Sequence, residues 1–460
     1  MSEIKLPEAF VLRMKNYLDE KEFTAFVKSL EKEPRVSIRI NPYKEIHLKE
    51  DVTSVAWNDE GYFLSERPSF TLDPLFHAGC YYVQESSSMF VAHILKCIQA
   101  PKDGIFLDLA ASPGGKSTLL SSFLGKDGFL VANEVIKTRA NILKENIIKW
   151  GLGNTMVTQN DPEHFRDLEG FFDLLLVDAP CSGEGLFRKD PEARNEWSED
   201  NVNLCAVRQE RIMDQAGALV KGGGHLIYST CTFNEKENED MIRFICSEYA
   251  YEPVRIPLDP DWKITESAIE TEEGTFYGYR FYPHHVEGEG FFISVFKRPE
   301  GAYIQEPKKT KDFKHSHIKA ASKQEKQRLI SDLGLDEKST FYSLQDSFFW
   351  TYAKHQTHFE FLSRFLNIRY FGVELGKFNK DQFIPNHELA VSVLPKTGFT
   401  THELNLDQAL TFLRKDDMEV SDIPQGWILV TYRNNPLGWI KNLGNRINNN
   451  YPKEWRIRMR

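Results

Sequence analysis

The chain has 460 residues, of which 41% are hydrophobic and 27% charged, and its net charge is −10. This length and composition predict a globular protein of several domains and exclude collagen-like and low-complexity chains. No apolar run approaches the roughly 20 residues that span a bilayer, and the first residues lack the apolar stretch of a secretory signal, so we expect no membrane partner and a cytoplasmic location.

The first hundred residues combine helical and strand patterns. The segments PEAFVLRMKNYL and EKEFTAFVKSLEK carry apolar residues at helical spacing. The segment VSIRINP predicts a short strand that ends at Pro42. We therefore expect a small α/β element over residues 1–98.

Residues 99–300 alternate apolar runs with amphipathic segments. The expected strands are GIFLDLA, FLVANE, NTMVTQN, FFDLLLVDAP, HLIYST and GFFISVFK. The expected helices are GKSTLLSSFL, TRANILKENIIKWG with Gly151 as its C-cap, residues 200–220 and EKENEDMIRFI. This alternation predicts an α/β fold, with a parallel sheet between helices on both faces.

The remainder of the chain changes in composition. Residues 301–325 are polar and predict a linker, whereas residues 326–390 and 391–460 carry aromatic and β-branched runs that predict β-rich modules. Residues 306–328 are basic, and from Arg433 onward there are seven basic residues and one acid, Glu454. Either stretch alone is compatible with an ordinary charged surface, but two of them in an acidic protein favour a polyanionic partner such as RNA.

Ligands of open α/β sheets bind at the C-terminal ends of the strands. The first core strand ends in DLAASPGGK, residues 108–116, whose small residues allow the backbone to approach a ligand. The next strand ends at Glu134, which is placed to hold ribose hydroxyls. The loop is neither GxGxxG nor a Walker loop. Together the two features indicate a cofactor that contains a nucleoside, while an ordinary turn and a solvated carboxylate remain the alternatives.

The chain has six cysteines and no CxxC pair, so we expect neither a metal site nor a disulfide framework. Two of them follow core strands: Cys181 in DAPCSG, which begins with Asp178, and Cys231 in STCTF. A buried structural thiol is the commoner role for either cysteine alone. Two cysteines and an aspartate at neighbouring strand ends favour a chemical role.

These residue types suit methylation of cytosine at C5. A thiolate that adds to C6 breaks the conjugation of the ring and makes C5 nucleophilic toward an electrophilic methyl group. An acid or hydrogen-bond donor must take up the developing charge, and the C5 proton must then leave. Lys116 could lower the pKa of the thiol or hold the base, or it could be a surface lysine.

The motifs DLAASPGGKST, DAPCSGEGLFRKDP and YSTCTFNEKENE resemble the bacterial and nucleolar RNA 5-methylcytosine methyltransferases of the Sun type. Arg39-Ile-Asn41, the segment GCYYVQESSSM around Gln84, and RFYPHHVEGEGFF extend the similarity over about residues 35–297. The resemblance implies a Rossmann-like, seven-stranded S-adenosylmethionine-dependent methyltransferase sheet with a reversed last hairpin. It also implies that a ferredoxin-like, RNA-binding element precedes this sheet.

The same resemblance implies roles for individual residues. Cys231 would be the nucleophile, Cys181 would assist product release, and Asp178 would contact the cytosine amine close to the cofactor. Glu134 would bind the ribose and Asp161 the adenine of S-adenosylmethionine. The methionine part would be lined by Ala110, Ala111, Ser112, Pro113, Gly114, Gly115 and Lys116. Arg139 matches a family arginine whose role is open.

The C-terminal extension resembles that of the ribosomal small-subunit methyltransferase F type, whose last module is related to the RNA-binding PUA fold. This resemblance implies a cytosine of 16S rRNA, free or in a 30S subunit, as the substrate, and we expect a monomer. Three alternatives are a transfer-RNA cytosine methyltransferase, a ribosome-assembly factor without catalysis, and an amino-group methylase. Amino-group methylases normally carry a DPPY-type loop. The corresponding DAPC of this chain keeps the aspartate and the proline but lacks the aromatic residue.

Overall fold

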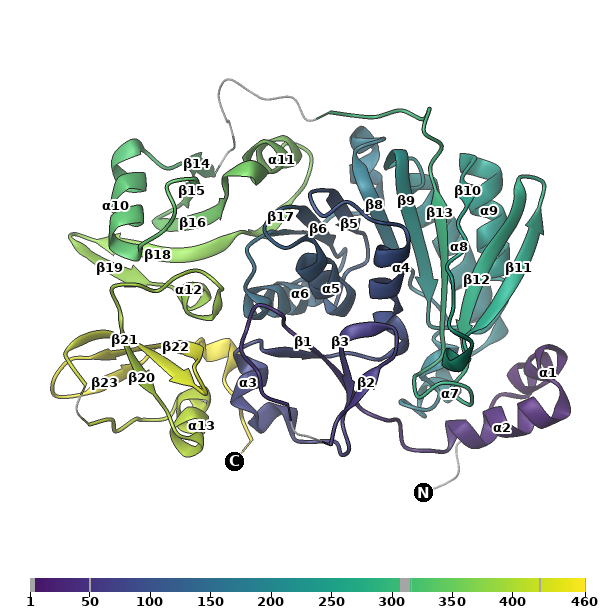
Figure 1. Ribbon diagram of the computed structural model, residues 1–460, viewed down its shortest axis with the longest axis horizontal. Coiled ribbons are helices and arrows are strands. Elements are labelled where there is room, and N and C mark those ends of the chain that lie inside the picture. The colour runs from purple at the N-terminus through teal and green to yellow at the C-terminus, as the bar shows by residue number, and fades with distance from the viewer. Residues whose placement is uncertain (1–4, 49–50, 307–314, 316, 422, 460) are drawn as a thin grey trace.

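The computed structural model describes residues 5–48, 51–306, 315, 317–421 and 423–459. A central sheet lies between two C-terminal modules on one side and a pair of N-terminal helices on the other (Figure 1). No helix in these ranges is long and apolar enough to cross a membrane.

The central sheet is mixed. Its side-by-side order is β11 (Thr265–Thr271), β12 (Gly274–Phe281), β13 (Phe291–Lys297), β9 (Val220–Thr230), β8 (Phe172–Asp178), β5 (Ile105–Asp108), β6 (Phe129–Asn133), β7 (Thr155–Thr158) and β17 (Ile368–Phe371); β10 (Glu252–Pro253) pairs with β13. The strands β5 to β9 are parallel to their neighbours in this set, and the outer strands are antiparallel. The order from β7 to β12 is the expected seven-stranded sheet with a reversed last hairpin.

Helices cover both faces of this sheet, as the sequence predicts. Apolar residues of α4 (Val91–Cys97), α5 (Gly115–Leu124) and α6 (Lys137–Trp150) form the core on one face. Those of α8 (Glu199–Ala216) and α9 (Glu239–Tyr249) form the core on the other face, and the short α7 (Ala193–Glu196) precedes α8. The left-handed Gly151, with φ 84°, ends α6 as expected. Strand β8 is buried on both faces because it lies at the centre of a covered parallel sheet.

The N-terminal region forms a second, antiparallel sheet in the order β2 (Thr53–Val55), β3 (Asn58–Phe63), β1 (Ser37–Ile40) and β4 (Tyr81–Val83). This is the strand order of a ferredoxin-like sheet. The expected resemblance stops at the strands, because no helix joins β1 to β2 in the described residues 41–48 and 51–52. Between β3 and β4 the chain forms a 3-10 turn (Phe70–Leu72) and the short α3 (Pro74–His77) in place of a long helix. The helices α1 (Glu8–Tyr17) and α2 (Glu20–Leu30) pack instead against the core domain through Phe10 and Phe26.

The C-terminal part forms two modules. The first contains β14 (Ile318–Ala320), α10 (Lys323–Leu333), β15 (Ser339–Leu344), β16 (Ser347–Tyr352), α11 (Gln356–Leu362), β18 (Val373–Asn379), β19 (Gln382–Pro385) and α12 (His387–Val391). The second contains β20 (Thr400–Glu403), α13 (Leu406–Arg414), β21 (Gly426–Tyr432), β22 (Asn435–Asn442) and β23 (Ile447–Asn449). Strand β17 leaves the first module and pairs with β7, so the extension completes the edge of the central sheet.

The structure corrects several predicted boundaries. The helix expected over 200–220 ends at Ala216, and Val220 already begins β9. The helix expected from Glu235 begins at Glu239, because the preceding residues form a turn. The expected linker 301–325 contains β14 and the start of α10, which Ser322 caps; residues 307–314 and 316 of that linker lie outside the described residues.

Candidate active site

A cavity of about 560 Å³ opens at the C-terminal ends of the parallel strands. Ala110 and Ser112 follow β5, Glu134 follows β6, Asp161 follows β7, and all four residues line the cavity. Parallel strands bring their C-terminal ends to one edge, and this edge is where such sheets bind ligands. Residues that the resemblance assigns to the methionine part, the ribose and the adenine of S-adenosylmethionine therefore line one cavity.

The groups around this cavity fit S-adenosylmethionine. The buried Glu134 carboxylate accepts a hydrogen bond from the backbone N–H of Ile136 (2.9 Å) and pairs with Arg139 at 3.5 Å, which leaves acceptor capacity for ribose hydroxyls. Ile136 is 50% exposed although it is apolar, and with Ile212 it offers an apolar surface for a purine ring. Asp161 lies at the same cavity and can accept from an exocyclic amine.

Arg139, whose role the sequence left open, joins two parts of this site. Its guanidinium donates to the backbone oxygen of Ser112 at 3.1 Å, and Ser112 Oγ donates to the backbone oxygen of Arg139 at 3.1 Å. The ion pair with Glu134 completes the link. Arg139 thus holds the loop after β5 against the start of α6.

The loop 110–116 divides between two cavities. Ala111, Pro113, Gly115 and Lys116 line a second cavity, of about 310 Å³, rather than the first. Gly114 lines neither cavity; its φ of 115° forms the left-handed turn that starts α5. Of the seven loop residues that the resemblance assigns to the methionine part of the cofactor, Ala110 and Ser112 line the first cavity.

Cys231 lies where the two cavities meet, together with Asp178. The sulfur of Cys231 is 3.2 Å from the sulfur of Cys181, and the Cys231 backbone N–H donates to Cys181 Sγ at 3.3 Å. Lys116 Nζ pairs with Asp178 Oδ2 at 2.9 Å, and Ser229 Oγ donates to Asp178 Oδ1 at 2.8 Å. The structure thus brings together all four residues that the sequence proposes for catalysis.

The charges of this cluster support one another. Burial opposes the charge of Lys116, but the carboxylates of Asp178 and Asp108 outweigh burial and raise the pKa of Lys116 above its ordinary value. The hydrogen bond with Cys231, burial and nearby negative charge raise the pKa of Cys181 well above that of a free thiol. At neutral pH the lysine is therefore a cation and Cys181 a neutral thiol.

Sequence reasoning missed a buried carboxyl group in the second cavity. Asp108, at the end of β5, is 1% exposed and accepts from Ser117 Oγ at 2.6 Å, while its Oδ1 has no partner among the described residues. Burial is the main cause that raises the pKa of Asp108 to about 7. The available signal was an acid at the end of the first core strand.

The Arg39-Ile-Asn41 segment has a structural role. Arg39 is buried and donates to Gln84 Oε1 at 2.8 Å and to Thr118 Oγ1 at 2.5 Å in α5. Asn41 Nδ2 donates to the backbone oxygen of Trp150 at 2.9 Å. These contacts fix the N-terminal sheet to α5 and α6, and Gln84 lines the second cavity.

No metal site was expected from the sequence. In the described ranges, however, Glu22, His284 and His285 have possible ligand atoms within 4.8 Å of one another. Both imidazoles contact Glu22 Oε2, at 2.8 and 2.6 Å, and neither lines the two cavities. We interpret this group as a contact between α2 and the loop before β13.

The fold, the nucleoside-binding edge and the cysteine pair define an S-adenosylmethionine-dependent methyltransferase of the Rossmann-like class. A family model described as 16S rRNA methyltransferase RsmB/F matches residues 96–297, one for the N-terminal domain of 16S rRNA methyltransferase RsmF matches residues 6–86, and one for the methyltransferase RsmF PUA domain matches residues 399–457. The chain belongs to the ribosomal RNA small subunit methyltransferase F family, whose members are RNA cytosine-5 methyltransferases.

Individual relatives agree over nearly the full length. Ribosomal RNA small subunit methyltransferase F of Erwinia tasmaniensis is 31% identical, over 98% of this chain and 97% of the relative. The protein of the same name in Shewanella oneidensis is 33% identical, over 87% and 84%. Among solved structures, a methyltransferase homolog from Pyrococcus horikoshii has 28% identity and a TM-score of 0.53, covering 64% of this chain and 96% of that one. NSun6 from Pyrococcus horikoshii shares the fold at 20% identity, with a TM-score of 0.53 and coverage of 64% and 98%.

Proposed function

We propose that this protein methylates C5 of a cytosine in 16S rRNA and that Cys231 is the covalent nucleophile. The observation that carries the proposal is the position of Cys231, which lines both the cavity that fits the cofactor and the cavity beside Lys116 and Asp178. A cytosine bound in the second cavity would have its C6 next to the Cys231 thiol and its C5 next to the methyl donor. This geometry is what addition at C6 and alkylation at C5 require.

The proposed reaction proceeds through a covalent bond between Cys231 and the cytosine ring. The Cys231 thiolate forms an S–C6 bond, and the electron pair of the C5–C6 double bond becomes available at C5. When bound, S-adenosylmethionine supplies the electrophilic methyl group. A solvent water molecule then takes the C5 proton, the C5–H electron pair restores the C5–C6 double bond, and the S–C6 bond breaks with its electron pair returning to the Cys231 thiolate.

Asp178 and Lys116 are suited to hold the base during these steps. Asp178 can accept a hydrogen bond from the exocyclic amine of cytosine, since its carboxylate lines both cavities. The Lys116 ammonium, only 14% exposed, can stabilise the negative charge that develops on the ring when the thiolate adds. The neutral Cys181 thiol cannot compete as a nucleophile at neutral pH, and we propose that it assists release of the product.

We propose that the residues lining the first cavity bind the parts of S-adenosylmethionine that the family resemblance implies for them. Ala110 and Ser112 contact the methionine part, Glu134 the ribose, and Asp161 the adenine. Of the other loop residues, Ala111, Pro113, Gly115 and Lys116 line the second cavity, in which we place the cytosine. Gly114 shapes the turn.

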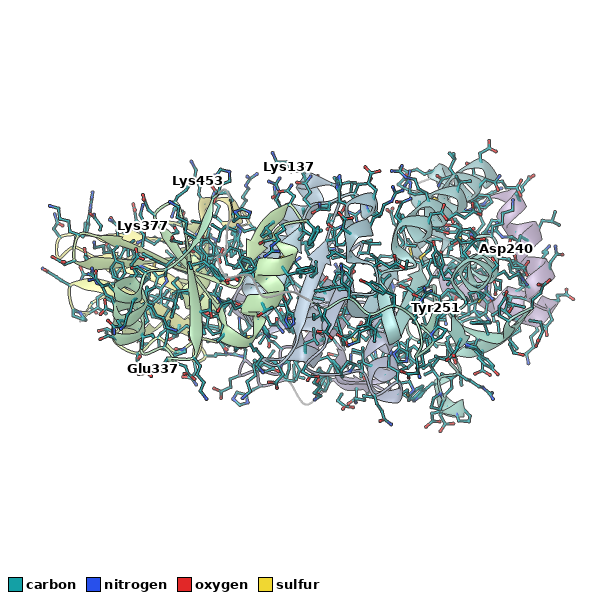
Figure 2. The ribbon with its side chains drawn as sticks, turned by 90° about the horizontal axis from the view of Figure 1, so that it is seen from above. Lys137, Asp240, Tyr251, Glu337, Lys377 and Lys453 are labelled. Atoms are coloured by element: carbon teal, nitrogen blue, oxygen red, sulfur yellow. The ribbon has the colours of Figure 1, made fainter. Side chains whose placement is uncertain are left out.

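We further propose that the N-terminal sheet and residues 391–460 are RNA-binding modules, and that the protein acts as a cytoplasmic monomer. Lys453, in the last module, and Lys137, the first residue of α6, lie along the same edge of the molecule in Figure 2. Ile136 and Arg139, close to Lys137 in the chain, line the cofactor cavity, so Lys453 lies on the same edge of the molecule as the start of α6. A paired target cytosine would have to leave its helix, because C5 and C6 of a stacked base are not both accessible.

The test is bisulfite mapping of ribosomal and transfer RNA from cells with the gene, without it, and with the Cys231→Ala variant. We expect one or more 16S rRNA cytosines to lose protection in the last two strains. Unchanged 16S rRNA would contradict the proposal, and loss of a transfer-RNA signal would transfer it to that substrate. Purified protein with RNA fragments from each source and labelled cofactor gives the same distinction in vitro.

A further inference from the structure

A buried polar network lies directly behind the two cysteines. Its centre is the carboxylate of Glu237, which is 0% exposed and lies in the turn between β9 and α9. Three N–H groups donate to this carboxylate, from Ser182, Gln209 and Asn234. Burial raises the pKa of Glu237 above its ordinary value, whereas the hydrogen bonds from Ser182 and Asn234 act in the opposite direction and favour the ionised carboxylate.

One side of the network holds the loop that carries Cys181. Glu237 Oε2 accepts from the backbone N–H of Ser182 at 2.9 Å and from Gln209 Nε2 at 2.9 Å. The same Gln209 nitrogen donates to the backbone oxygen of Pro180 at 3.0 Å. The residues on either side of Cys181 are therefore both tied to Glu237, directly or through Gln209.

The other side holds the loop that carries Cys231. Glu237 Oε1 accepts from Asn234 Nδ2 at 2.7 Å, and the Glu237 backbone N–H donates to Asn234 Oδ1 at 2.9 Å. Asn234 also donates to Thr232 Oγ1 at 2.8 Å. Tyr228 OH donates to the Glu237 backbone oxygen at 2.8 Å, which fixes the turn to β9.

We propose that Glu237 is a positioning residue that clamps the two cysteine loops together and sets the different roles of Cys181 and Cys231. This inference rests on the proposed function, because it explains how one thiol attacks while the other stays neutral. Glu237 touches neither cavity, so it acts through the loops and not on the substrate.

The charges around the two sulfurs are arranged for this division. The ionisable groups that act on Cys181 include Cys231 and Glu237, and the negative charge of each raises the pKa of Cys181, after the larger effects of the Cys231 hydrogen bond and burial. The buried Tyr228 hydroxyl and Asp178 lie in the same group and add no positive charge. Cys231 instead interacts with the Lys116 cation. Burial lowers the pKa of Lys116, but Asp178, Asp108 and, to a smaller extent, Cys231 raise it above its ordinary value. Glu237 therefore places a negative charge beside Cys181, whereas Cys231 lies beside the positive charge of Lys116. This difference favours Cys231 as the nucleophile.

The first test titrates Cys181 itself. In the Cys231→Ala protein, alkylation of Cys181 by iodoacetamide is followed against pH by mass spectrometry of its peptide. Adding Glu237→Gln should move the midpoint down by about 1 pH unit, because a neighbouring negative charge is removed. Glu235→Gln, which removes a charge from an exposed position of the same turn, should leave the midpoint in place. An unchanged midpoint with Glu237→Gln would overturn the electrostatic part of the proposal.

The second test measures methyl transfer with both cysteines present. Glu237→Gln should lower kcat by about tenfold or more with little change in the KM for the cofactor, because misplaced loops cost positioning rather than binding. Glu237→Asp keeps the charge but shortens the clamp, so kcat should fall while the Cys181 midpoint stays near that of the parent. If Glu237→Gln does not fold, a folded Glu237→Asp protein with parental kcat contradicts the clamp. Turnover by Cys231→Ala would instead contradict the proposed function and leave the Cys181 titration interpretable on its own.

Discussion

The sulfur atoms of Cys181 and Cys231 lie 3.2 Å apart although 50 residues separate them in the chain. The cause is the parallel pairing of β8 with β9, in which Asp178 stands opposite Ser229. Cys181 follows the end of β8 at Asp178 after two intervening residues, and Cys231 directly follows the end of β9 at Thr230, at the same edge of the sheet. One substrate carbon can therefore lie within reach of both thiols, which allows one to attack and the other to take part in release.

Replacing Cys231 by alanine should remove methyl transfer, by about 10³-fold or more, because burial and the nearby Glu237 keep the other thiol within reach, Cys181, neutral at neutral pH. Cofactor affinity should change little, since the cavity around Glu134 is intact. Incorporation of labelled methyl groups into RNA measures the first and equilibrium dialysis the second. Residual turnover within tenfold of the parent would contradict the assignment.

Replacing Cys181 by alanine should let the covalent complex form but slow its breakdown. The protein–RNA adduct should accumulate as a slower band on a denaturing gel, in a cofactor-dependent way. Cys97→Ala, at a half-buried thiol in α4 away from both cavities, is the matched control and should show no band. If the Cys181→Ala protein shows no such band, the proposed role of Cys181 in product release is contradicted.

Asp108 should make stability depend on pH. Its folded-state pKa of about 7 lies above the ordinary carboxyl value because of burial, so its contribution is fully present at acid pH and is lost as the pH rises through about 7. Between pH 5 and pH 8 the parent should lose roughly 2 to 3 kcal/mol that Asp108→Asn does not lose. Urea unfolding of both proteins at the two pH values measures this, with exposed Asp417→Asn as the control. Parallel curves for parent and Asp108→Asn would show that Asp108 is ionised throughout.

The C-terminal extension should stabilise the catalytic core. Phe371 of β17 is 3% exposed and stacks on Phe359 (ring centroids 4.3 Å apart) and Phe349 (5.0 Å), within the core cluster of the central sheet. Phe371→Ala should lower the free energy of unfolding by about 3 to 5 kcal/mol. Leu12→Ala, at a residue 67% exposed, should change it by less than about 0.5 kcal/mol. Equal effects would mean that β17 is not integral to the core.

The basic residues of the last module should contribute phosphate contacts. Lys453, Arg456 and Arg458 are exposed and make no ion pair within the described part of the chain. Changing all three to glutamine should weaken RNA binding about tenfold or more at physiological salt. The slope of log K against the logarithm of the salt concentration should become less steep by about 2 to 3. Exchanging lysine for arginine and arginine for lysine at the same positions keeps the charge and should keep both values. Unaltered salt dependence in the glutamine variant would place the RNA elsewhere.

The core of the fold could be predicted from the sequence because its signals are local. The apolar run FDLLLVD forms a strand as expected, and the glycine after Trp150 ends α6 at the expected residue. The site followed from the same logic, since Cys181, Cys231 and Glu134 all stand just after apolar runs. Strand ends of a parallel sheet meet whatever the intervening chain does.

The features that could not be predicted depend on distant partners. Strand β17 is four residues long and becomes a strand by pairing with β7, about 200 residues earlier. For that reason, deleting residues 326–460 would remove part of the central sheet as well as RNA contacts. Glu237 looks like one acid among several in NEKENE, and only the folded turn shows that it is buried among N–H donors. Asp108 likewise depends on the burial that the neighbouring strands impose.

The most direct measurement of the central claim is the site of attachment in the adduct that the Cys181→Ala protein accumulates. The band is digested with protease and nuclease, and tandem mass spectrometry locates the nucleotide on the peptide. We predict a 5-methylated cytosine nucleotide bonded to the sulfur at position 231. A nucleotide on any other residue would contradict the account.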